Sequence, residues 1–298
     1  MQLSGDGLMM ADAFLAQRAH LRRVAYRMLG DPHAVEDVLQ EAWLRWQAQA
    51  SLPDVPAAWL HTVVSRLCLD QLRLRRQAQH HYAGSWLPAP WQDEADEQAD
   101  PLAQLGQRAE LGQALMLLLE RLSPDERVAW VMYDSFDHDH RQIATVLGRS
   151  EAACRQLVSR ARKRLQQGER RFACPPEQRQ QVLLQFLTAL GSGDLSGLLA
   201  TLAPAVQLHS DGGGKVLAAS RPVHGPRAVS RLLLGVRRVQ PAGSSIQLAC
   251  RGGETVLLGL VDGALHFQMS FAVGARGIQG LYLQLNPDKL AQPVAVHT

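Results

Sequence analysis

The sequence predicts a multidomain chain in which two all-α domains are followed by one α+β domain. Apolar residues recur at helical spacing through residues 11–80 and again through 101–172. Beyond these, two amphipathic helices precede short β-like runs that alternate with glycine-rich turns. Helices followed by a meander of strands are typical of helices packed on a curved sheet. We therefore expect domains at 11–80, 101–172 and 176–290, with a linker at 81–100.

The composition is that of an ordinary folded protein. The chain has 298 residues, 46% of them hydrophobic and 20% charged, which argues against wholesale disorder. Its formal net charge of +3 is too small to indicate nucleic-acid binding by itself. The distribution is more informative, because residues 149–171 hold eight Arg or Lys and two acids, whereas residues 91–110 hold six acids and one Arg. A basic block beside an acidic one predicts a local electrostatic surface and a separate spacer.

The four cysteines lie far apart, and none forms a Cys-x-x-Cys or Cys/His pattern with zinc-ligand spacing. We expect no metal site, no disulfide framework and no cofactor. The N-terminus lacks the basic and apolar segments of a signal peptide. No stretch approaches roughly eighteen continuous apolar residues, the length that indicates a membrane span. We expect a cytoplasmic protein with no membrane partner.

Residues 30–46 form the most informative helix of the first domain. Asp31 can cap this helix, and Pro32 suits its first turn. Its apolar stripe comprises Val35, Leu39, Ala42, Trp43 and Trp46. Its other side is acidic and amide-rich, with Glu36, Asp37, Gln40 and Glu41. That side fits an ordinary solvated helix face as well as a docking surface.

A third helix begins at Pro56 and runs towards His80. It carries aromatic, small polar and basic side chains, namely Trp59, His61, Thr62, Ser65, Arg66, Arg73, Arg75 and Arg76. Such side chains suit a surface that stacks unpaired bases and neutralises phosphates. The alternative is a basic helix end that complements its own dipole, with Trp59 in the core.

The stretch 82–100 is rich in prolines, tryptophans and acids, which predicts a linker rather than a helix or strand. A helix is expected over 102–122. The sequence Ser123-Pro-Asp-Glu126 then forms a capping box with Pro in the first turn, a specific signal for the start of a helix.

Residues 139–165 have the pattern of a helix-turn-helix, because two helices are joined by a turn with Gly148, and Ser150 can cap the second. The apolar sides expected to pack together are those of Ile143, Leu147, Ala153, Leu157 and Ala161. The outer face then holds side chains suited to base edges in the major groove, Ser150, Glu151, Ala152, Arg155, Gln156, Ser159 and Arg160. Phosphate binding suits Arg149, Arg160, Arg162, Lys163 and Arg164. The alternative is a helical hairpin with solvated charges.

In the third domain, helices are expected over 180–190 and from 191 through Leu202. The expected strands are Val206–His209, Val216–Ala219, Ser245–Cys250, Thr255–Val261, Ala264–Ala272 and Gly277–Leu285. Residue types that could act as catalytic bases are His209, Asp211, His224, Asp262 and His266. A base also needs a pocket and a tuned pKa, and Asp211 before three glycines suits the cap of a turn.

Several of these segments together resemble bacterial extracytoplasmic-function sigma factors of the sigma-70 family. Gly-Asp-Pro-His-Ala-Val-Glu-Asp-Val-Leu-Gln-Glu, from Gly30, resembles the helix by which these factors grip RNA polymerase. Ala-Trp-Leu-His-Thr-Val-Val-Ser-Arg-Leu-Cys-Leu-Asp-Gln-Leu-Arg, from Ala58, resembles the sigma region 2 element that melts and reads the promoter −10 region. The helix-turn-helix resembles sigma region 4, which reads the −35 element. Trp-Leu-Pro-Ala-Pro resembles a linker motif of one subgroup, in which Glu usually stands at the position of Ala89.

The third domain resembles the SnoaL-like cone fold of nuclear transport factor two and the ketosteroid isomerases. Asp-Gly-Gly-Gly-Lys at 211–215 and Asn-Pro-Asp-Lys-Leu at 286–290 resemble paired signatures of sigma factors with a fused SnoaL-like extension. In that subgroup the extension takes the place of a separate anti-sigma factor and modulates activity in cis. The resemblance covers residues 11–290.

The resemblance, with the faces described above, implies four sets of site residues. Core polymerase binding is assigned to Glu36, Asp37, Gln40, Glu41, Arg45 and Trp46. Binding of −10 DNA is assigned to Trp59, Thr62, Arg66, Asp70, Arg73 and Arg76. Binding of −35 DNA is assigned to Arg149, Ser150, Glu151, Ala152, Arg155, Gln156, Ser159, Arg160, Arg162 and Lys163. The regulatory motifs comprise Asp211, Gly212, Gly213, Gly214, Lys215, Asn286, Pro287, Asp288, Lys289 and Leu290.

The resulting hypothesis is a sigma factor whose partners are core RNA polymerase and promoter DNA. We expect the third domain to pack against both DNA readers and hold them in an arrangement that suits DNA poorly. Two alternatives stay open, a DNA-binding regulator that acts without polymerase, and a SnoaL-type enzyme or small-ligand sensor with a DNA-binding appendage. The sequence names no promoter, inducing signal or ligand.

Overall fold

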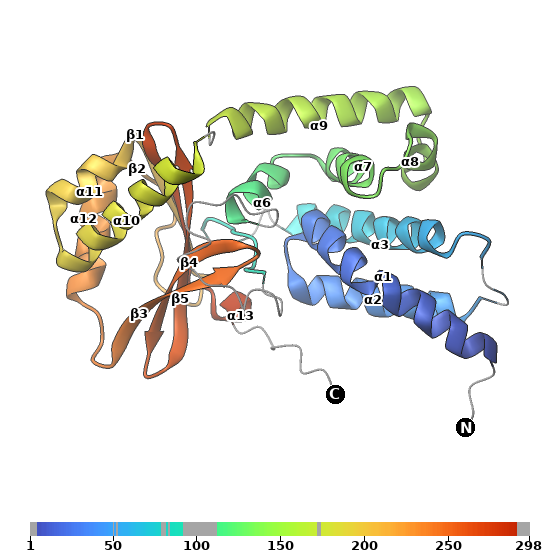
Figure 1. Cartoon of the computed structure of the whole chain (residues 1–298), viewed down its shortest axis with the longest axis horizontal. Coiled ribbons are helices and arrows are strands. Elements are labelled where there is room, and N and C mark those ends of the chain that lie inside the picture. The colour runs from blue at the N-terminus through green and yellow to red at the C-terminus, as the bar shows by residue number, and fades with distance from the viewer. Residues whose placement is uncertain are drawn as a thin grey trace. The chain divides into compact units, whose positions relative to one another are not determined.

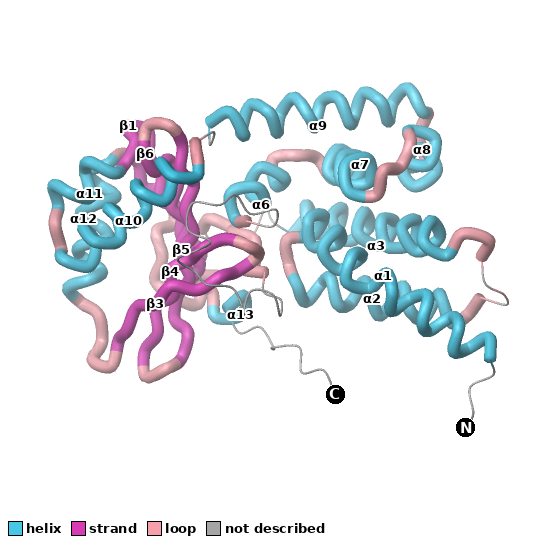
Figure 2. Tube along the Cα trace, in the orientation of Figure 1, coloured by secondary structure: helices cyan, strands magenta, loops and turns pink. Residues whose placement is uncertain are grey.

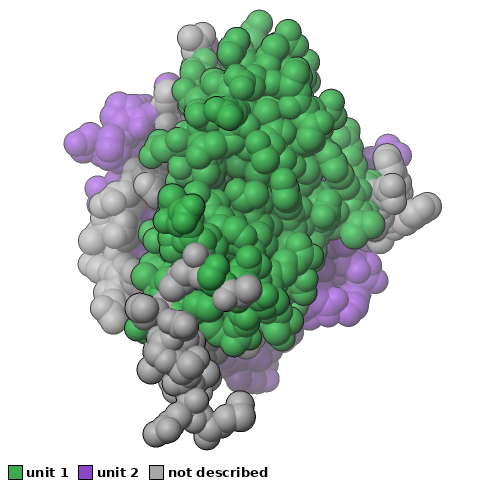
Figure 3. Space-filling model, turned by 90° about the vertical axis from the view of Figure 1, so that its right-hand side faces the viewer, with its two compact units in different colours: residues 1–80, 118–166 green, residues 81–117, 167–298 purple. Residues whose placement is uncertain are grey.

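A computed structural model of the chain describes residues 5–49, 51, 53–78, 82, 84–91, 112–171 and 174–290. The chain divides into two compact units, each formed by two separate stretches of sequence (Figure 3). Unit 1 comprises Met1–His80 and Leu118–Gln166, and unit 2 comprises His81–Leu117 and Gln167–Thr298.

Unit 1 begins with three helices, α1 (Gly5–Leu29), α2 (Pro32–Gln47) and α3 (Pro56–Ala78). Gly30, at a φ of 66°, takes the left-handed conformation that ends α1, and Asp31 accepts the backbone N–H groups of His33 and Ala34. The predicted cap and the proline in the first turn of α2 are therefore confirmed. The buried core of this bundle includes Leu21, Val24, Met28, Val35, Leu39, Leu60 and Val64.

The second part of unit 1 holds α7 (Pro124–Ser135), α8 (His140–Leu147) and most of α9 (Glu151–Arg171). The capping box of Ser123 and Glu126 forms as predicted. Gly148 lies between α8 and α9 with a φ of 63°, a conformation that glycine adopts without steric cost. The helix before α7 is described only as α6 (Gln113–Glu120), because the rest of the predicted 102–122 helix lies outside the described residues.

Unit 2 is built on one sheet of six strands in the order β2-β1-β6-β5-β4-β3. The strands are β1 (Leu202–Asp211), β2 (Val223–His224), β3 (Ser244–Arg251), β4 (Glu254–Val261), β5 (Ala264–Gly274) and β6 (Gly277–Gln284). Only β1 and β6 pair in parallel among the described strands. The long strands curve across the unit (Figure 2).

Three helices cover one face of this sheet, α10 (Pro176–Ser192), α11 (Leu195–Thr201) and α12 (Pro226–Arg238) (Figure 1). Their apolar sides meet the sheet in a core that includes Phe186, Leu190, Leu198, Leu208, Val229, Leu233, Leu257 and Leu281. A short helix, α13 (Pro287–Leu290), follows β6. The predicted fold class, two all-α parts followed by an α+β cone-shaped SnoaL-like domain, is confirmed.

In the third domain one predicted strand does not form, and one helix forms that the sequence analysis does not predict. Val216–Ala219 is a loop rather than a strand, because Gly212 O accepts the N–H groups of Lys215 and Val216 and turns the chain back. Helix α12 was not predicted, although Pro226 at its start and apolar residues at 229, 232, 233 and 236 have helical spacing. Helix α12 covers part of one face of the sheet, so the sequence prediction lacks one of the helices that pack on that face.

Candidate functional site

The predicted polymerase-binding face of α2 divides into exposed and paired side chains. Asp37 and Gln40 are exposed, with no ion pair found for Asp37 within the described residues. Glu36 accepts Arg18 and Arg22 of α1, each at 2.8 Å. Glu41 pairs with Arg45, one helical turn later, at 2.8 Å. The acidity available to a partner is therefore concentrated at Asp37.

Trp46 does not belong to that face. Its side chain is fully buried, and its indole N–H donates to Met10 O at 2.8 Å. The Trp46 ring lies 5.3 Å from that of Trp59. The apolar stripe of α2 therefore ends in the core, and Trp46 is enclosed in this structure rather than exposed on the predicted polymerase-binding face.

The sequence reasoning missed a groove between α1 and α2 next to Gln40. It has a volume of about 370 Å³, and Phe14, Leu15 and Trp43 line it. Leu15 is 63% exposed, although it is a large aliphatic residue on an otherwise well-packed helix. The missed signal in the sequence is that Leu15 lies beside the buried Phe14 but off the apolar stripe of α1.

The predicted −10 surface of α3 is mostly accessible. Arg66, Asp70, Arg73 and Arg76 are exposed. Thr62 is partly buried and donates its hydroxyl to Ala58 O. Two residues of α3 are less exposed than a base-stacking surface requires. Trp59 is partly buried against Trp46, and Ser65 is fully buried.

The two predicted DNA readers contact each other within unit 1. Arg66 donates to Thr145 O of α8 at 3.0 Å. Arg73 pairs at 3.0 Å with Asp125 of α7, a carboxylate that also pairs with Arg149. One carboxylate thus holds a predicted −10 arginine and a predicted −35 arginine together.

Aromatic rings complete this contact, which we call the reader seam. It comprises His20, His61, Arg66, Arg73, Asp125, Phe136, His138 and Thr145. The Phe136 ring stacks on His61 with centroids 3.8 Å apart and an interplanar angle of 7°. His20 lies 5.3 Å from the same ring. Arg127, buried at the side of the seam, donates to Arg27 O at 2.9 Å.

Burial lowers the pKa of His61 to about 4 from its ordinary value of 6.5, and the neighbouring His138 and His20 reinforce the shift. Burial, together with the charge of Arg23, also lowers the pKa of His20. The seam therefore favours neutral imidazoles, and Nε2 of both His61 and His138 is buried without a hydrogen-bond partner.

Acidification should weaken the reader seam. Since the pKa of folded His61 lies below that of the unfolded chain, the associated stability is fully present above about pH 6.5 and is lost as the pH falls towards 4. The thermal unfolding midpoint of the full chain should fall across this window. His61→Phe, which keeps a ring against Phe136, should make the fall shallower, and an equally steep fall would assign it to other groups.

The predicted recognition face of α9 is exposed throughout. The exposed side chains are those of Arg149, Ser150, Glu151, Ala152, Arg155, Gln156, Ser159, Arg160, Arg162 and Lys163. The buried side holds Cys154, Leu157, Val158, Ala161 and Leu165, and Ile143 and Leu147 of α8 are buried as well. Ser150 accepts the Ala153 N–H, which gives α9 its side-chain cap. Arg160 also pairs with Glu126, so part of this basic face is engaged inside the unit.

In unit 2, Asp211 collects donors from distant parts of the chain. Its side chain is fully buried at the end of β1. It accepts the Tyr82 hydroxyl at 2.7 Å, the Leu87 N–H at 2.9 Å and the Lys289 ammonium at 2.6 Å. It also caps the turn through Gly213 N–H, as the run of glycines predicts.

The second signature supplies the other side of this cluster. Lys289 donates to Leu87 O at 2.7 Å and lies over the rings of Trp86 and Tyr82, at 4.3 and 4.9 Å from their centroids. Asn286 donates to the Tyr82 hydroxyl at 3.2 Å. Burial, with the bond to Asp211, raises the pKa of Tyr82, which keeps its hydroxyl a donor. We call Tyr82, Trp86, Leu87, Asp211, Asn286 and Lys289 the linker clamp.

Backbone geometry explains the glycines beside Asp211. Gly213 has a φ of 62°, and a Cβ there would lie 2.4 Å from the Asn286 side chain. A Cβ on Gly212 would lie 2.2 Å from Val216 O. The close approach of the second signature therefore excludes a side chain at Gly213, and the chain's own turn excludes one at Gly212. Gly214 has a φ of 71°, and outside the clamp Lys215 pairs with Asp288 at 2.7 Å on the surface.

The predicted linker is partly a bound segment. Leu87, Ala89 and Trp91 are almost fully buried in unit 2. Pro88 O accepts the side chains of Gln113 and Gln284. The segment forms neither helix nor strand, as predicted, but the expectation of a plain spacer is wrong for residues 84–91. The acidic stretch 92–100 lies outside the described residues.

The candidate bases do not converge on one cavity. A cavity of about 640 Å³ in unit 2 is lined by none of His209, Asp211, His224, Asp262 and His266, and His266 lines a separate one of about 380 Å³. Among the described residues, no group of three or more His, Cys, Asp or Glu is arranged to hold a metal ion. None of the helices in the described ranges combines the length and apolar character that crossing a bilayer requires.

Comparisons with known proteins agree with this geometry. Sigma-70 region 2 matches residues 14–78, and Sigma-70, region 4 matches residues 112–165. The ECF RNA polymerase sigma factor SigJ of Mycobacterium tuberculosis is 42% identical over 81% of this chain and 78% of its own length. The probable ECF RNA polymerase sigma factor SigI of the same organism is 31% identical over 93% of both chains. The crystal structure of M. tuberculosis SigJ has a TM-score of 0.72 and 38% identity, covering 94% of this chain and 97% of that one.

Proposed function

This chain belongs to the extracytoplasmic-function (ECF) RNA polymerase sigma factors, and we propose which of its described surfaces bind polymerase, which read promoter DNA and which regulate both. The chain directs promoter-specific transcription initiation and has core RNA polymerase and promoter DNA as its partners. It acts in the cytoplasm, where polymerase and promoters are found. The functional parts are residues 11–80, the linker 81–100, residues 101–172 and the regulatory domain 176–290.

The polymerase-binding surface centres on Asp37 and Gln40, with Glu36, Glu41 and Arg45 around them. The groove beside Gln40 adds an apolar contact through Leu15 and Trp43. Exposed polar groups around an accessible apolar groove are the usual composition of a protein-binding surface. Glu36 acts mainly by holding Arg18 and Arg22 in place.

Reversing the charge of Asp37 tests this surface. Asp37→Lys should weaken binding to purified core polymerase by roughly tenfold or more, because it places like charge against a partner selected for an acidic side chain. Promoter-specific transcription should fall in parallel. Asp54→Lys, an exposed acid before α3, is the matched control and should leave both unchanged. Equal losses of polymerase binding in the two variants would show that this face of α2 is not the polymerase-binding surface.

The DNA-reading surfaces are the exposed sides of α3 and α9. Arg66, Asp70, Arg73 and Arg76, with Trp59 and Thr62, contact the −10 element. The outer face of α9, from Ser150 to Lys163, enters the major groove at the −35 element. Arg66, Arg73 and Arg149 are exposed but paired inside unit 1, so each must exchange its present partner before it binds phosphate.

The regulatory proposal rests on the linker clamp. The third domain binds residues 82–91, which belong to the segment between the two readers, through Asp211, Asn286 and Lys289. A bound linker has less reach than a free one of the same length. The domain therefore controls in cis how far the readers can separate, and it does so by binding rather than by catalysis.

Promoter-specific transcription with purified core polymerase tests this proposal. The full chain is compared with a version that ends at Arg171 and with Tyr82→Phe, which removes one clamp hydroxyl. Both changes should alter initiation in the same direction relative to the full chain. Equal initiation by all three proteins would show that the clamp has no regulatory role.

A further inference from the structure

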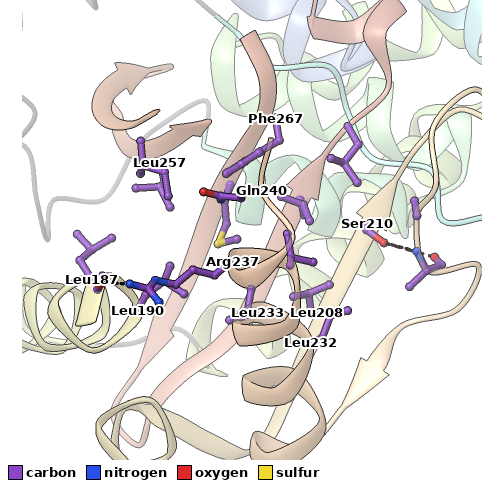
Figure 4. Close-up of a pocket in the computed structure, with 18 of the residues that line it drawn as sticks. Leu187, Leu190, Leu208, Ser210, Leu232, Leu233, Arg237, Gln240, Leu257 and Phe267 are labelled. Atoms are coloured by element: carbon purple, nitrogen blue, oxygen red, sulfur yellow. Dashed lines mark hydrogen bonds between the residues drawn. The ribbon is translucent and has the colours of Figure 1, made fainter. Parts of the chain in front are cut away.

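A cavity in unit 2 lies between the helices and the sheet, on the side of α12 (Figure 4). Its volume is about 640 Å³, within the usual range for small-molecule sites. Ten of its lining residues are leucines, against a single phenylalanine. The walls come from the helices α10 and α12 and from the strands β1, β3, β4, β5 and β6, and they include Leu187, Leu208, Leu233, Leu257, Phe267 and Met269. A surface this aliphatic suits a flexible hydrocarbon better than a planar aromatic ligand.

Polar groups around this cavity are few. Arg237 is the only charged residue among those that line it. It is exposed and donates to Gly191 O at 2.7 Å, and within the described residues no carboxylate pairs with it. Figure 4 shows its side chain running from α12 towards α10. An unpaired guanidinium beside an apolar cavity is suited to a carboxylate.

Apolar side chains near Arg237 are left in contact with water. Leu217 is 97% exposed, and Val236 and Ile246 are each 45% exposed. All three line the cavity. Exposed aliphatic residues grouped around one cavity indicate a surface that a ligand would cover.

We propose that this cavity binds a long-chain aliphatic carboxylate, with the hydrocarbon among the leucines and the carboxylate at Arg237. The lining has no Asp, Glu, His, Cys, Lys or Tyr. The one hydroxyl in the lining, that of Ser210, is bonded to the Ala219 backbone and has no general base beside it, so the site holds its ligand without transforming it. It is a sensor site on a transcription factor.

The cavity shares its wall with the linker clamp. Leu217, Ala218 and Ala219 line it and follow the Asp-Gly-Gly-Gly-Lys signature after one intervening residue, Val216. Ser210 and Leu285, which also line it, flank the clamp residues Asp211 and Asn286. Leu285 N–H donates to Asp211 O at 2.8 Å, and Ala219 N–H donates to the Ser210 hydroxyl at 2.9 Å.

This shared wall couples ligand to linker, an extension that rests on the regulatory role proposed above. A ligand that requires the wall in its clamped form must favour the clamped state, and the clamp must in turn favour the ligand. Binding of the carboxylate and binding of residues 82–91 therefore reinforce each other. The ligand holds the linker more firmly.

Titration of the full chain with the fluorescent fatty acid cis-parinaric acid tests the site. Binding should saturate at one molecule per chain, and palmitic acid should displace the probe. Arg237→Gln should weaken binding roughly tenfold, whereas Arg238→Gln, next to it on α12 but outside the lining, should not. Hexadecanol should bind both variants equally, which shows that the cavity is intact. Binding that does not saturate, or that ignores Arg237, would overturn the carboxylate assignment.

A second pair of variants tests the entrance to the cavity. Leu217→Glu should weaken parinarate binding by roughly tenfold, because it adds negative charge and removes an apolar contact. Val239→Glu is the matched control, since Val239 is 79% exposed and does not line this cavity. Equal weakening in both would indicate adsorption to the surface instead.

Tyr82→Phe tests the coupling, because Tyr82 belongs to the clamp and does not line the cavity. It should weaken parinarate binding by at least roughly fivefold, the lower end of ordinary coupling between sites. Tyr133→Phe in α7 is the control and should have no effect. An unchanged affinity in Tyr82→Phe would refute the coupling and leave the cavity assignment standing. This experiment measures ligand affinity, whereas the transcription assay proposed above measures the regulatory role of the clamp. Failure of one proposal can therefore be told from failure of the other.

Discussion

Replacing Lys289 with Met should lower the free energy of unfolding of the third domain by about 3 kcal/mol, the lower part of the range for breaking a buried ion pair. The pair joins Lys289, whose side chain is 14% exposed, to the fully buried Asp211. Met removes the ammonium and leaves the carboxylate in the interior. The remaining donors, Tyr82, Leu87 and Gly213, hold the loss below the upper part of that range.

Chemical denaturation of the full chain, followed by a probe in the third domain, measures this loss. Lys215→Met is the matched control, because the Lys215–Asp288 pair is 56% and 61% exposed and should contribute at most about 1 kcal/mol. Similar effects of the two substitutions would mean that Asp211 finds another cation or reaches water.

A double substitution separates charge from packing. Asp211→Asn in the Lys289→Met background removes the unpaired carboxylate, so part of the lost stability should return. The return should be incomplete, because the new amide cannot accept hydrogen bonds from Tyr82, Leu87 and Gly213 at both of its terminal atoms. No return at all would place the loss in the contacts of the Lys289 side chain with Trp86 and Tyr82.

Features of the fold that depend on neighbouring residues could be predicted from the sequence. The cap at Asp31, the capping box at Ser123 and the helix-turn-helix around Gly148 each arise within a few residues of chain. The exposed face of α9 follows from the spacing of its buried residues. Such features depend on helix geometry, which the sequence pattern encodes directly.

Features that depend on distant partners could not be derived in this way. The sequence shows that Asp211 can cap a turn, but not that Tyr82 and Lys289 reach the same carboxylate from 129 and 78 residues away. Trp46 and Trp59 are similar in local sequence terms, yet Trp46 is fully buried and Trp59 is only partly so. Helix α12, by contrast, depends on neighbouring residues, because Pro226 and the apolar spacing after it are a local helix signal that stands between two β-like runs.

Phe136→Ala should open the reader seam and raise the affinity of the full chain for promoter DNA in the absence of polymerase. The Phe136 side chain is 9% exposed, and its ring contacts His61, His20 and His138. Replacing a buried Phe with Ala costs about 3–5 kcal/mol in protein cores. The contacts with His20 and His61 join the end of α7 to α1 and α3. Much of the lost free energy therefore stabilises the closed arrangement of the readers and not each reader by itself.

The gain in DNA binding follows from the groups that the open arrangement releases. Arg66, Arg73 and Arg149 are paired across or beside the seam, and each released guanidinium can bind a phosphate. A shift of about 3 kcal/mol changes the ratio of open to closed protein by roughly a hundredfold. Affinity should therefore rise by roughly tenfold or more, with a steeper dependence on salt as more phosphates are contacted.

Tyr133→Ala is the matched control for this experiment, because Tyr133 lies in the last turn of α7, just before Phe136, but contacts His140 and Arg162 within the second reader. It should leave DNA affinity near that of the unmodified chain. Phe136→Ala should also remove the acid sensitivity assigned to His61, since that imidazole loses the ring that buries it. Unchanged DNA affinity in a folded Phe136→Ala protein would show that the paired arginines do not limit access to promoter DNA, and control would then reside in the linker alone.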